Sequence, residues 1–358
     1  MTSRFKIDFW LLIPALVLVA VSLTVLFAIN PVYFRFQLIS TGIALLGFLF
    51  FSQFRLALFQ RLSLPIYIVS LVLLGIVLIL GFESRGAARW VELFGVSIQF
   101  SEVLKPFLSI AFVTFLLQTR FSDLKTFFLS LLLLFPILLA IDLQPDLGSA
   151  LMYAGTAFFV LLVRGFPFKW FFFSSLPFLF VSPFLWMRLH DYQKQRIFTF
   201  LNPTADPLGT SYNTIQAIIA VGSGTFFGKG LSEGTQSGLR FLPERHTDFI
   251  FATLAEGLGF VGGAIVILTL LFLCYRIGKV FTQTNDQFTK LFAASCFAFF
   301  LIQGVVNIGM NMGFLPIVGV TLPFVSFGGS SLLANFIFLG MLSSLSVSHR
   351  HKEVLEIR

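Results

Sequence analysis

The residues best suited to chemistry stand directly before an apolar run that begins near residue 248. The segment Phe241-Leu-Pro-Glu-Arg-His-Thr-Asp-Phe-Ile-Phe-Ala252 places five polar side chains in a row: Glu244, Arg245, His246, Thr247 and Asp248. A carboxylate at the mouth of a cavity can take a proton from a substrate hydroxyl, so Asp248 is a candidate general base. Aspartate is also a good helix N-cap. The residues alone leave both interpretations open.

Other polar groups stand at the ends of apolar runs. Glu102 and Lys105 are three residues apart at the start of a predicted helix, so they share a face and can form an ion pair. Asp146 lies between Pro145 and Gly148, where it can line a site or cap the next helix. Ionisable groups at membrane depth are costly, and each is therefore a hypothesis of function.

Two glycine-rich segments need a separate interpretation. Gly222 to Gly230 looks like a phosphate loop, but Ser223 and Gly230 break the Walker A spacing. We therefore expect a turn there, with Lys229 available to a phosphate. The segment from Asn307 to Ser331 is rich in Gly and Pro. Irregular backbone at membrane depth must be buried in protein or line a cavity.

The elements that carry these residues are membrane-spanning helices. The chain has 358 residues, of which 57% are hydrophobic and 11% charged, whereas a soluble domain has about 25% charged residues. Its apolar runs approach the roughly 20 residues that a spanning helix needs. We predict an all-α polytopic membrane protein with one domain, residues 1–358, and about ten spans. The spans are expected near 8–28, 32–51, 64–82, 101–119, 127–141, 148–163, 168–189, 248–275, 290–312 and 328–347.

The charge distribution predicts the orientation. Most of the 24 Lys and Arg fall in short loops on the side of the N-terminus, which is the cytoplasmic side by the positive-inside rule. An even number of spans puts the C-terminus there too. The loop of about 190–247, between the seventh and eighth helices, is then extracytoplasmic, and its apolar residues favour short amphipathic helices on the membrane surface. Because the basic residues are spread through loops, we expect no binding of nucleic acid.

Together these motifs resemble the SEDS family (shape, elongation, division and sporulation). The resemblance extends from near Glu83 to Ser331, and the string Leu242-Pro-Glu-Arg-His-Thr-Asp248 is its most specific part. Arg245 makes the chain more similar to the elongation branch, RodA, than to the division branch, FtsW. The other matching pieces are Gly86 to Trp90, Ser101 to Lys105, Gln144 to Gly148, Tyr192 to Ile197, Gly228 to Gly230 and Gly328 to Ser331.

The resemblance implies a peptidoglycan glycosyltransferase that polymerises lipid II on the outer face of the bacterial cytoplasmic (inner) membrane. It implies inversion at the sugar, release of undecaprenyl diphosphate and a role in cell elongation and cell shape. The implied partners are a class B penicillin-binding protein (a transpeptidase) and MreB, MreC and MreD of the rod complex, besides the membrane lipids.

The resemblance also favours Asp248 as the catalytic base over the capping role. We expect a divalent cation, Mg²⁺ or Mn²⁺, to be a possible cofactor at Asp248 or Glu244. The expected substrate-binding residues are Trp90, Glu102, Lys105, Asp146, Arg196, Lys229, Arg240, Glu244, Arg245, His246, Thr247 and Ser330.

Three other functions remain open at this stage. A lipid II flippase would also have broken helices and intramembrane charges, but it needs polar groups along the whole path, and here they gather on one side. A non-catalytic scaffold for the transpeptidase would tolerate changes at Asp248. An O-antigen ligase-like enzyme shares the long outer loop, but the Leu-Pro-Glu-Arg-His-Thr-Asp string argues against it.

Overall fold

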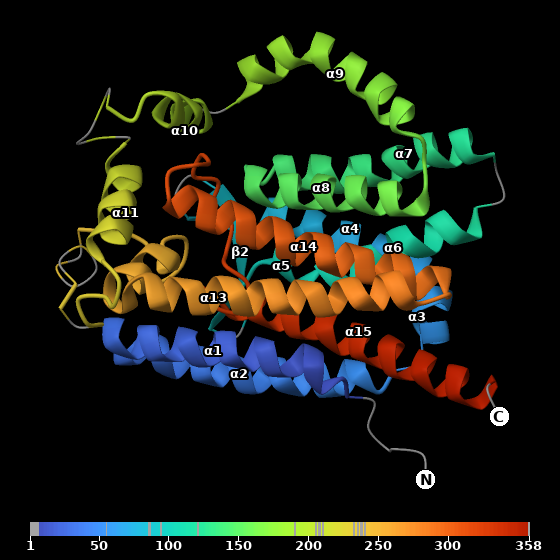
Figure 1. Ribbon diagram of the computed structural model, residues 1–358. Coiled ribbons are helices and arrows are strands. Elements are labelled where there is room, and N and C mark those ends of the chain that lie inside the picture. The colour runs from blue at the N-terminus through green and yellow to red at the C-terminus, as the bar shows by residue number, and fades with distance from the viewer. Residues whose placement is uncertain are drawn as a thin grey trace.

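Long apolar helices run side by side in a bundle (Figure 1). The computed structural model describes residues 7–54, 56–84, 87–93, 95–119, 122–189, 191–204, 206, 209, 211–231, 233–234, 236, 239 and 241–356. Eight of the helices in this part of the chain are long and apolar enough to cross a membrane. They are α1 (Phe9–Ile29), α2 (Pro31–Ser52), α4 (Ser63–Leu80), α7 (Asp123–Asp142), α8 (Leu147–Arg164), α13 (Ile250–Gln283), α14 (Gln287–Asn311) and α15 (Gly329–Glu356).

The remaining two predicted spans correspond to less regular helices. The fourth is α6 (Lys105–Gln118), which has 14 residues and follows a separate short helix, α5 (Phe100–Val103). The seventh is α9 (Phe168–Arg188), which contains two prolines. The predicted all-α, polytopic class is confirmed, and the chain is an integral membrane protein.

The connections contain the smaller elements. The described part of the predicted long loop contains the short helices α10 (Asp191–Leu201) and α11 (Tyr212–Ser223). Another short helix, α3 (Leu56–Arg61), follows α2. A three-stranded antiparallel sheet precedes α5, with β1 (Phe82–Ser84), β2 (Ala87–Leu93) and β3 (Val96–Ile98) in that order. Trp90 pairs with Phe82 across this sheet. These strands are not apparent in the sequence, because segments this short show no clear alternation of apolar and polar residues.

Contacts beyond the two ends of α1 define the ends of the bundle. At the start of α1, the Asp8 backbone N–H donates to Ser343 Oγ at 2.7 Å, and Ser346 Oγ donates to Asp8 Oδ2 at 3.2 Å. α1 has 21 residues, which correspond to roughly 30 Å of helix. Beyond its far end, the Tyr33 ring stacks on the His246 ring with centroids 4.3 Å apart. The segment that carries Asp248 therefore lies at the end of the bundle opposite Asp8.

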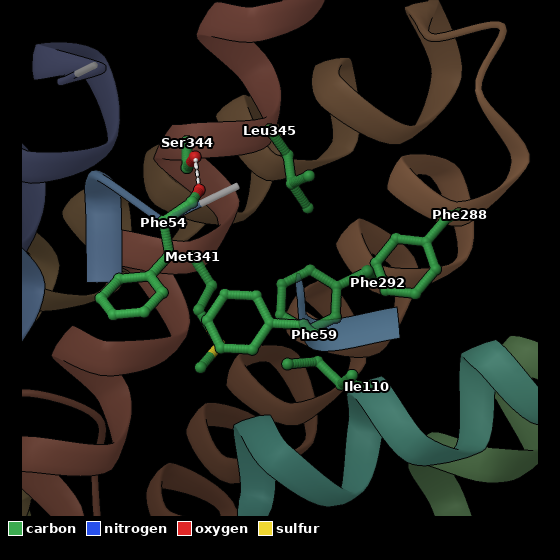
Figure 2. Close-up of a pocket in the computed structure, with 8 residues that line it drawn as sticks. All are labelled: Phe54, Phe59, Ile110, Phe288, Phe292, Met341, Ser344 and Leu345. Carbon is green, nitrogen blue, oxygen red and sulfur yellow. Dashed lines mark hydrogen bonds between the residues drawn. The ribbon is translucent and has the colours of Figure 1, made fainter. Parts of the chain in front are cut away.

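Beside the buried polar group of Asp8, Ser343 and Ser346, this end of the bundle contains an apolar cavity. The cavity has a volume of about 10 Å³ and is enclosed mostly by aromatic and aliphatic side chains (Figure 2). Its one polar lining residue, Ser344, donates its hydroxyl to the Phe54 carbonyl at 2.7 Å. The other lining residues are Phe54, Phe59, Ile110, Phe288, Phe292, Met341 and Leu345. This arrangement fits packing rather than binding of a polar substrate.

α13 is interrupted at Gly259, whose φ of 68° and ψ of −162° are not helical. The glycine-rich segment 224–230 runs beside the interruption: the Phe260 N–H donates to the Thr225 carbonyl at 2.9 Å, and the Lys229 N–H donates to the Glu256 carbonyl at 3.0 Å. A Cβ at Gly228 would lie 2.2 Å from the Gly257 carbonyl oxygen. The expected turn is present, and its glycines permit close backbone packing.

Candidate functional site

Asp248 ends a tight turn directly before α13. The N–H groups of Thr247 and Phe249 donate to the Glu244 carbonyl at 3.1 and 3.2 Å, and the Thr247 hydroxyl donates to Glu244 Oε2 at 2.9 Å. The N-cap of α13 is Phe249, whose own side chain makes no capping hydrogen bond. Asp248 is therefore not the N-cap residue of α13, and its side chain is half-buried.

The Asp248 turn is fixed by backbone contacts from α14 and from the segment before α15. Asn307 Nδ2 and Asn311 Nδ2 both donate to the Asp248 carbonyl, at 3.1 and 2.9 Å. The Ser326 hydroxyl donates to the Thr247 carbonyl at 2.8 Å, and the Phe327 N–H donates to the His246 carbonyl at 2.9 Å. Three consecutive carbonyls are thus held in place, so the Asp248 side chain starts from a rigid backbone.

The segment around Ser326 is in turn fastened to the first two helices. The Ser22 hydroxyl of α1 donates to the Val325 carbonyl at 2.6 Å. Gln37 of α2 donates its Nε2 to the Ser326 carbonyl at 3.2 Å and accepts from the Gly328 N–H at 3.3 Å. The irregular segment was singled out from the sequence, but Ser22 and Gln37 were not. They could have been identified as polar side chains inside apolar helices.

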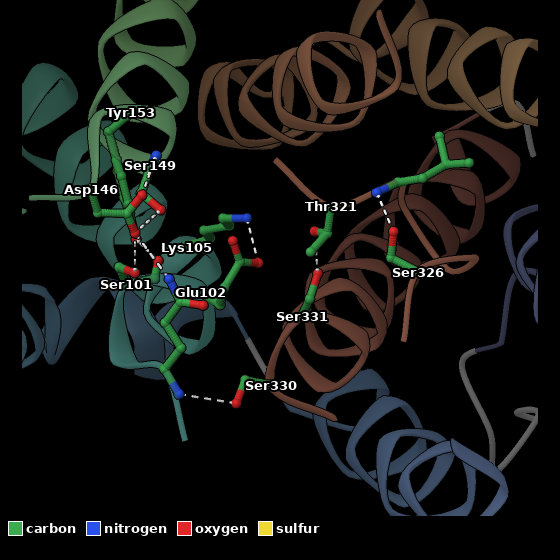
Figure 3. A network of polar contacts seen from close by, with 12 residues as sticks. Ser101, Glu102, Lys105, Asp146, Ser149, Tyr153, Thr321, Ser326, Ser330 and Ser331 are labelled. Carbon is green, nitrogen blue, oxygen red and sulfur yellow. Dashed lines mark hydrogen bonds and ion pairs between the residues drawn. The ribbon is translucent and has the colours of Figure 1, made fainter. Parts of the chain in front are cut away.

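A second polar cluster centres on Asp146 at the start of α8 (Figure 3). Asp146 caps α8 by accepting from the Ser149 N–H at 3.1 Å, and it accepts from the Ser149 hydroxyl at 2.7 Å and from Gln99 Nε2 at 2.9 Å. It also forms an ion pair with Arg89 at 3.4 Å. Asp146 is 2% exposed, so its oxygens are occupied by these contacts and its position is that of a structural cap.

Glu102 and Lys105 form the ion pair that their spacing predicts. Lys105 Nζ lies 2.6 Å from Glu102 Oε2, and the two side chains are 1% and 10% exposed. The ammonium also lies over the Phe299 ring of α14, 5.8 Å from the ring centroid. The pair is buried at the start of α6, where each charge is matched by the other.

The segment 318–331 contacts both the start of α8 and the Asp248 turn. A Cβ at Gly148 would lie 2.5 Å from the Val318 carbonyl oxygen, so the start of α8 packs directly on this backbone. One residue later, a Cβ at Gly319 would lie 3.7 Å from Asp248 Oδ2. Ser330, 7% exposed, accepts from the Gln99 N–H at 3.1 Å. The structure therefore connects the Asp146 cluster to Asp248 through one stretch of backbone.

The other predicted site residues are more dispersed. Trp90, Arg196 and Arg245 are half-buried, in β2, in α10 and in the Asp248 turn. Lys229 is exposed, and its N–H binds the carbonyl of Glu256, which stands eight residues after Asp248, or about 12 Å along a helix. Arg240 lies outside the described residues.

The described residues contain no group of three or more His, Cys, Asp or Glu side chains placed to hold a metal ion. Glu244 and Asp248 are two carboxylate residues at the start and the end of one turn. Mg²⁺ in phosphate-processing sites is commonly bound by one or two carboxylates together with substrate phosphates, so this set fits a cation that arrives with a phosphorylated substrate.

Comparisons with known proteins agree with this architecture. A family model described as cell cycle protein, covering FtsW, RodA and SpoVE, matches residues 3–351. The peptidoglycan glycosyltransferase MrdB of Escherichia coli (strain K12) is 39% identical over 292 residues, which cover 81% of this chain and 78% of MrdB. The probable peptidoglycan glycosyltransferase FtsW of Hydrogenovibrio crunogenus is 34% identical over 375 residues, covering 99% of this chain and 95% of the relative.

Solved structures of similar proteins have the same fold. A chain of a peptidoglycan synthase complex, solved to describe the structural coordination of polymerization and crosslinking, superposes with a TM-score of 0.83 at 29% identity, covering 96% of this chain and 98% of that chain. The crystal structure of the rod shape determining protein RodA of Thermus thermophilus superposes with a TM-score of 0.73 at 28% identity, covering 96% and 97% of the two chains.

Proposed function

Because the chain belongs to the FtsW, RodA and SpoVE family of cell cycle proteins, we propose that it is a peptidoglycan glycosyltransferase that polymerises lipid II during cell elongation. The observation that carries this proposal is the state of Asp248. Asp248 is not the N-cap of α13, and its backbone carbonyl accepts hydrogen bonds from Asn307 and Asn311. It lies at the end of the bundle opposite Asp8. A carboxylate held in this way is suited to proton transfer.

In the proposed reaction, the 4-hydroxyl of an N-acetylglucosamine attacks the anomeric carbon of an N-acetylmuramic acid. A glycosidic C–O bond forms while the bond from that carbon to the diphosphate oxygen breaks, with inversion. Undecaprenyl diphosphate leaves with the electron pair, and Asp248 takes the proton of the attacking hydroxyl. General base catalysis of this kind contributes roughly 10²- to 10⁴-fold in rate.

The diphosphate requires positive charge. Arg245, in the Asp248 turn, and Arg196, in α10, are our first candidates, because a guanidinium can bind two phosphate oxygens at once. Lys105 is less suited, since Glu102 already neutralises it at 2.6 Å. Lys229 remains a candidate for a more distant phosphate contact. A divalent cation shared by Asp248, Glu244 and the diphosphate would supply further charge stabilisation.

We propose that the Asp248 end faces the outside of the cytoplasmic membrane and that both termini face the cytoplasm. The distribution of Lys and Arg supports this orientation. So does the position of Asp248 at the far end of α1 from the first described residues. The lipid tail of the donor then approaches from within the bilayer, along helices that expose large aromatic residues such as Phe180 and Phe184 of α9.

We further propose that a class B penicillin-binding protein is the partner and that the pair works with MreB, MreC and MreD. The similarity to a chain of a complex that coordinates polymerization and crosslinking supports a crosslinking partner.

A flippase is the second candidate function. The apolar lining of the cavity near Asp8 argues against it, since a polar headgroup needs polar contacts along its whole path.

The test is a polymerisation assay. Purified protein in detergent, with and without its transpeptidase, is incubated with labelled lipid II and the products are separated by size. We expect ladders of glycan strands. A flippase or a scaffold would leave lipid II unpolymerised in both incubations, and that result would reject the proposed function.

A further inference from the structure

Two buried asparagines lie on one face of α14. Asn307 and Asn311 are four residues apart, so their side chains lie one above the other, and both are fully buried. A buried amide inside a membrane bundle is costly unless its hydrogen bonds are satisfied. Both asparagines meet this requirement through the backbone of the Asp248 turn.

Asn311 replaces a hydrogen bond of the α13 helix. In an uninterrupted helix the Ala252 N–H would donate to the Asp248 carbonyl, four residues before it. Here the Ala252 N–H donates to Asn311 Oδ1 at 3.0 Å, and the Asp248 carbonyl accepts from Asn311 Nδ2 at 2.9 Å. The second hydrogen of Nδ2 goes to the Asn307 carbonyl at 2.8 Å. The amide is therefore inserted between the two groups that would close the first turn.

This insertion explains where α13 begins. Its N-cap is Phe249 and its first helical residue is Ile250, so Asp248 stays outside the helix. If the Asn311 amide were absent, the Ala252 N–H and the Asp248 carbonyl could pair directly. The helix would then lengthen at its start, and the Asp248 carboxylate would turn away from Gly319.

Asn307 binds the backbone of Asp248 and the backbone next to Gly319. Its Nδ2 donates to the Asp248 carbonyl at 3.1 Å and to the Val320 carbonyl at 2.7 Å. Val320 follows Gly319, which lies against the carboxylate. One amide thus ties the backbone of Asp248 to the backbone that faces its side chain.

We infer that Asn311, assisted by Asn307, is a positioning residue of the transfer reaction, because it keeps Asp248 out of α13 and directed at Gly319. This inference rests on the proposed role of Asp248 as the base. A misplacement of about 1 Å can cost on the order of 100-fold in rate. We therefore expect Asn311→Leu to lower kcat on the order of 100-fold while the KM for lipid II changes less than about threefold.

The matched control is Asn335→Leu. Asn335 is a 2% exposed asparagine of α15 whose Nδ2 has no hydrogen-bond partner among the described residues. Its substitution also removes a buried amide from the bundle, and we expect kcat to stay within threefold of the unmodified protein. Should Asn311→Leu fail to accumulate, Asn311→Asp keeps an acceptor for Ala252 and removes both donors, and it is expected to show the same fall in kcat.

The decisive comparison adds Asp248→Asn to each protein. If Asn311 acts through Asp248, the Asn311→Leu, Asp248→Asn double variant is no slower than Asp248→Asn alone. If the falls in kcat of the two single variants multiply in the double variant, the inference is wrong. It is also wrong if Asn311→Leu is as active as Asn335→Leu. Neither result affects the proposed function. Near-normal turnover by Asp248→Asn alone would instead reject the proposed base, and the inference with it.

Discussion

Gly319 faces the Asp248 carboxylate: a Cβ on that glycine would stand 3.7 Å from Asp248 Oδ2, in van der Waals contact with it. Gly319 has a φ of +73°, a left-handed conformation that costs a residue with a side chain about 1–2 kcal/mol. Its missing side chain leaves space beside the carboxylate, where the proposed mechanism needs an acceptor hydroxyl.

We therefore expect Gly319→Ala to lower kcat/KM for lipid II by at least about tenfold, because the methyl group occupies the approach to the base. Gly165→Ala is the matched control: Gly165 ends α8 with a φ of +97° and has nothing near its Cβ position. Both variants should lose a similar amount of thermal stability, but the control should keep its activity. Equal activity of the two variants would show that Gly319 serves the backbone alone.

The buried ion pair between Glu102 and Lys105 should affect the stability of the protein most when only one partner is removed. Removing one partner of a buried ion pair costs about 3–5 kcal/mol, since the other charge is left alone. We expect Glu102→Gln and Lys105→Met each to lower the thermal unfolding temperature strongly, and the double variant to be more stable than the sum of the two losses predicts. The measurement is thermal unfolding of the purified proteins in detergent. Strictly additive losses would mean that the 2.6 Å contact contributes no coupling energy.

Gly148 should be intolerant of a side chain for a different reason. A Cβ there would lie 2.5 Å from the Val318 carbonyl oxygen, a backbone atom that cannot rotate away. We expect Gly148→Ala to cost about 1–3 kcal/mol of stability and to lower turnover, because Val318 and Gly319 would have to move together. Gly42→Ala is its control, since Gly42 lies in α2 with open space around it; there a helical alanine should gain about 0.5–1 kcal/mol.

The membrane architecture and one ion pair could be predicted from the sequence. Apolar run length determines the spans, and the i, i+3 spacing of Glu102 and Lys105 is a local property of a helix. The strands between residues 82 and 98 could not be foreseen, because their pairing depends on partners that short segments do not encode.

The position of Asp248 outside α13 could not be predicted from the sequence either. An aspartate directly before an apolar run is normally a helix cap, and the sequence contains nothing locally to contradict that assignment. Asn311, which displaces the first turn, is 63 positions away in the chain. The pattern of Asn307 and Asn311 at helical spacing in an apolar run is visible in the sequence, but it does not reveal which backbone the amides bind.

The central claim is that Asp248 takes the proton during transfer, and its most direct test is the rate of glycan synthesis by Asp248→Asn. Asparagine keeps the size of the side chain but cannot act as the base, so kcat should fall roughly 10²- to 10⁴-fold. The control is Asp8→Asn at the opposite end, where Asp8 caps α1 and asparagine caps equally well; it should remain active. A folded Asp248→Asn protein that polymerises lipid II at the rate of the Asp8→Asn control would contradict the account.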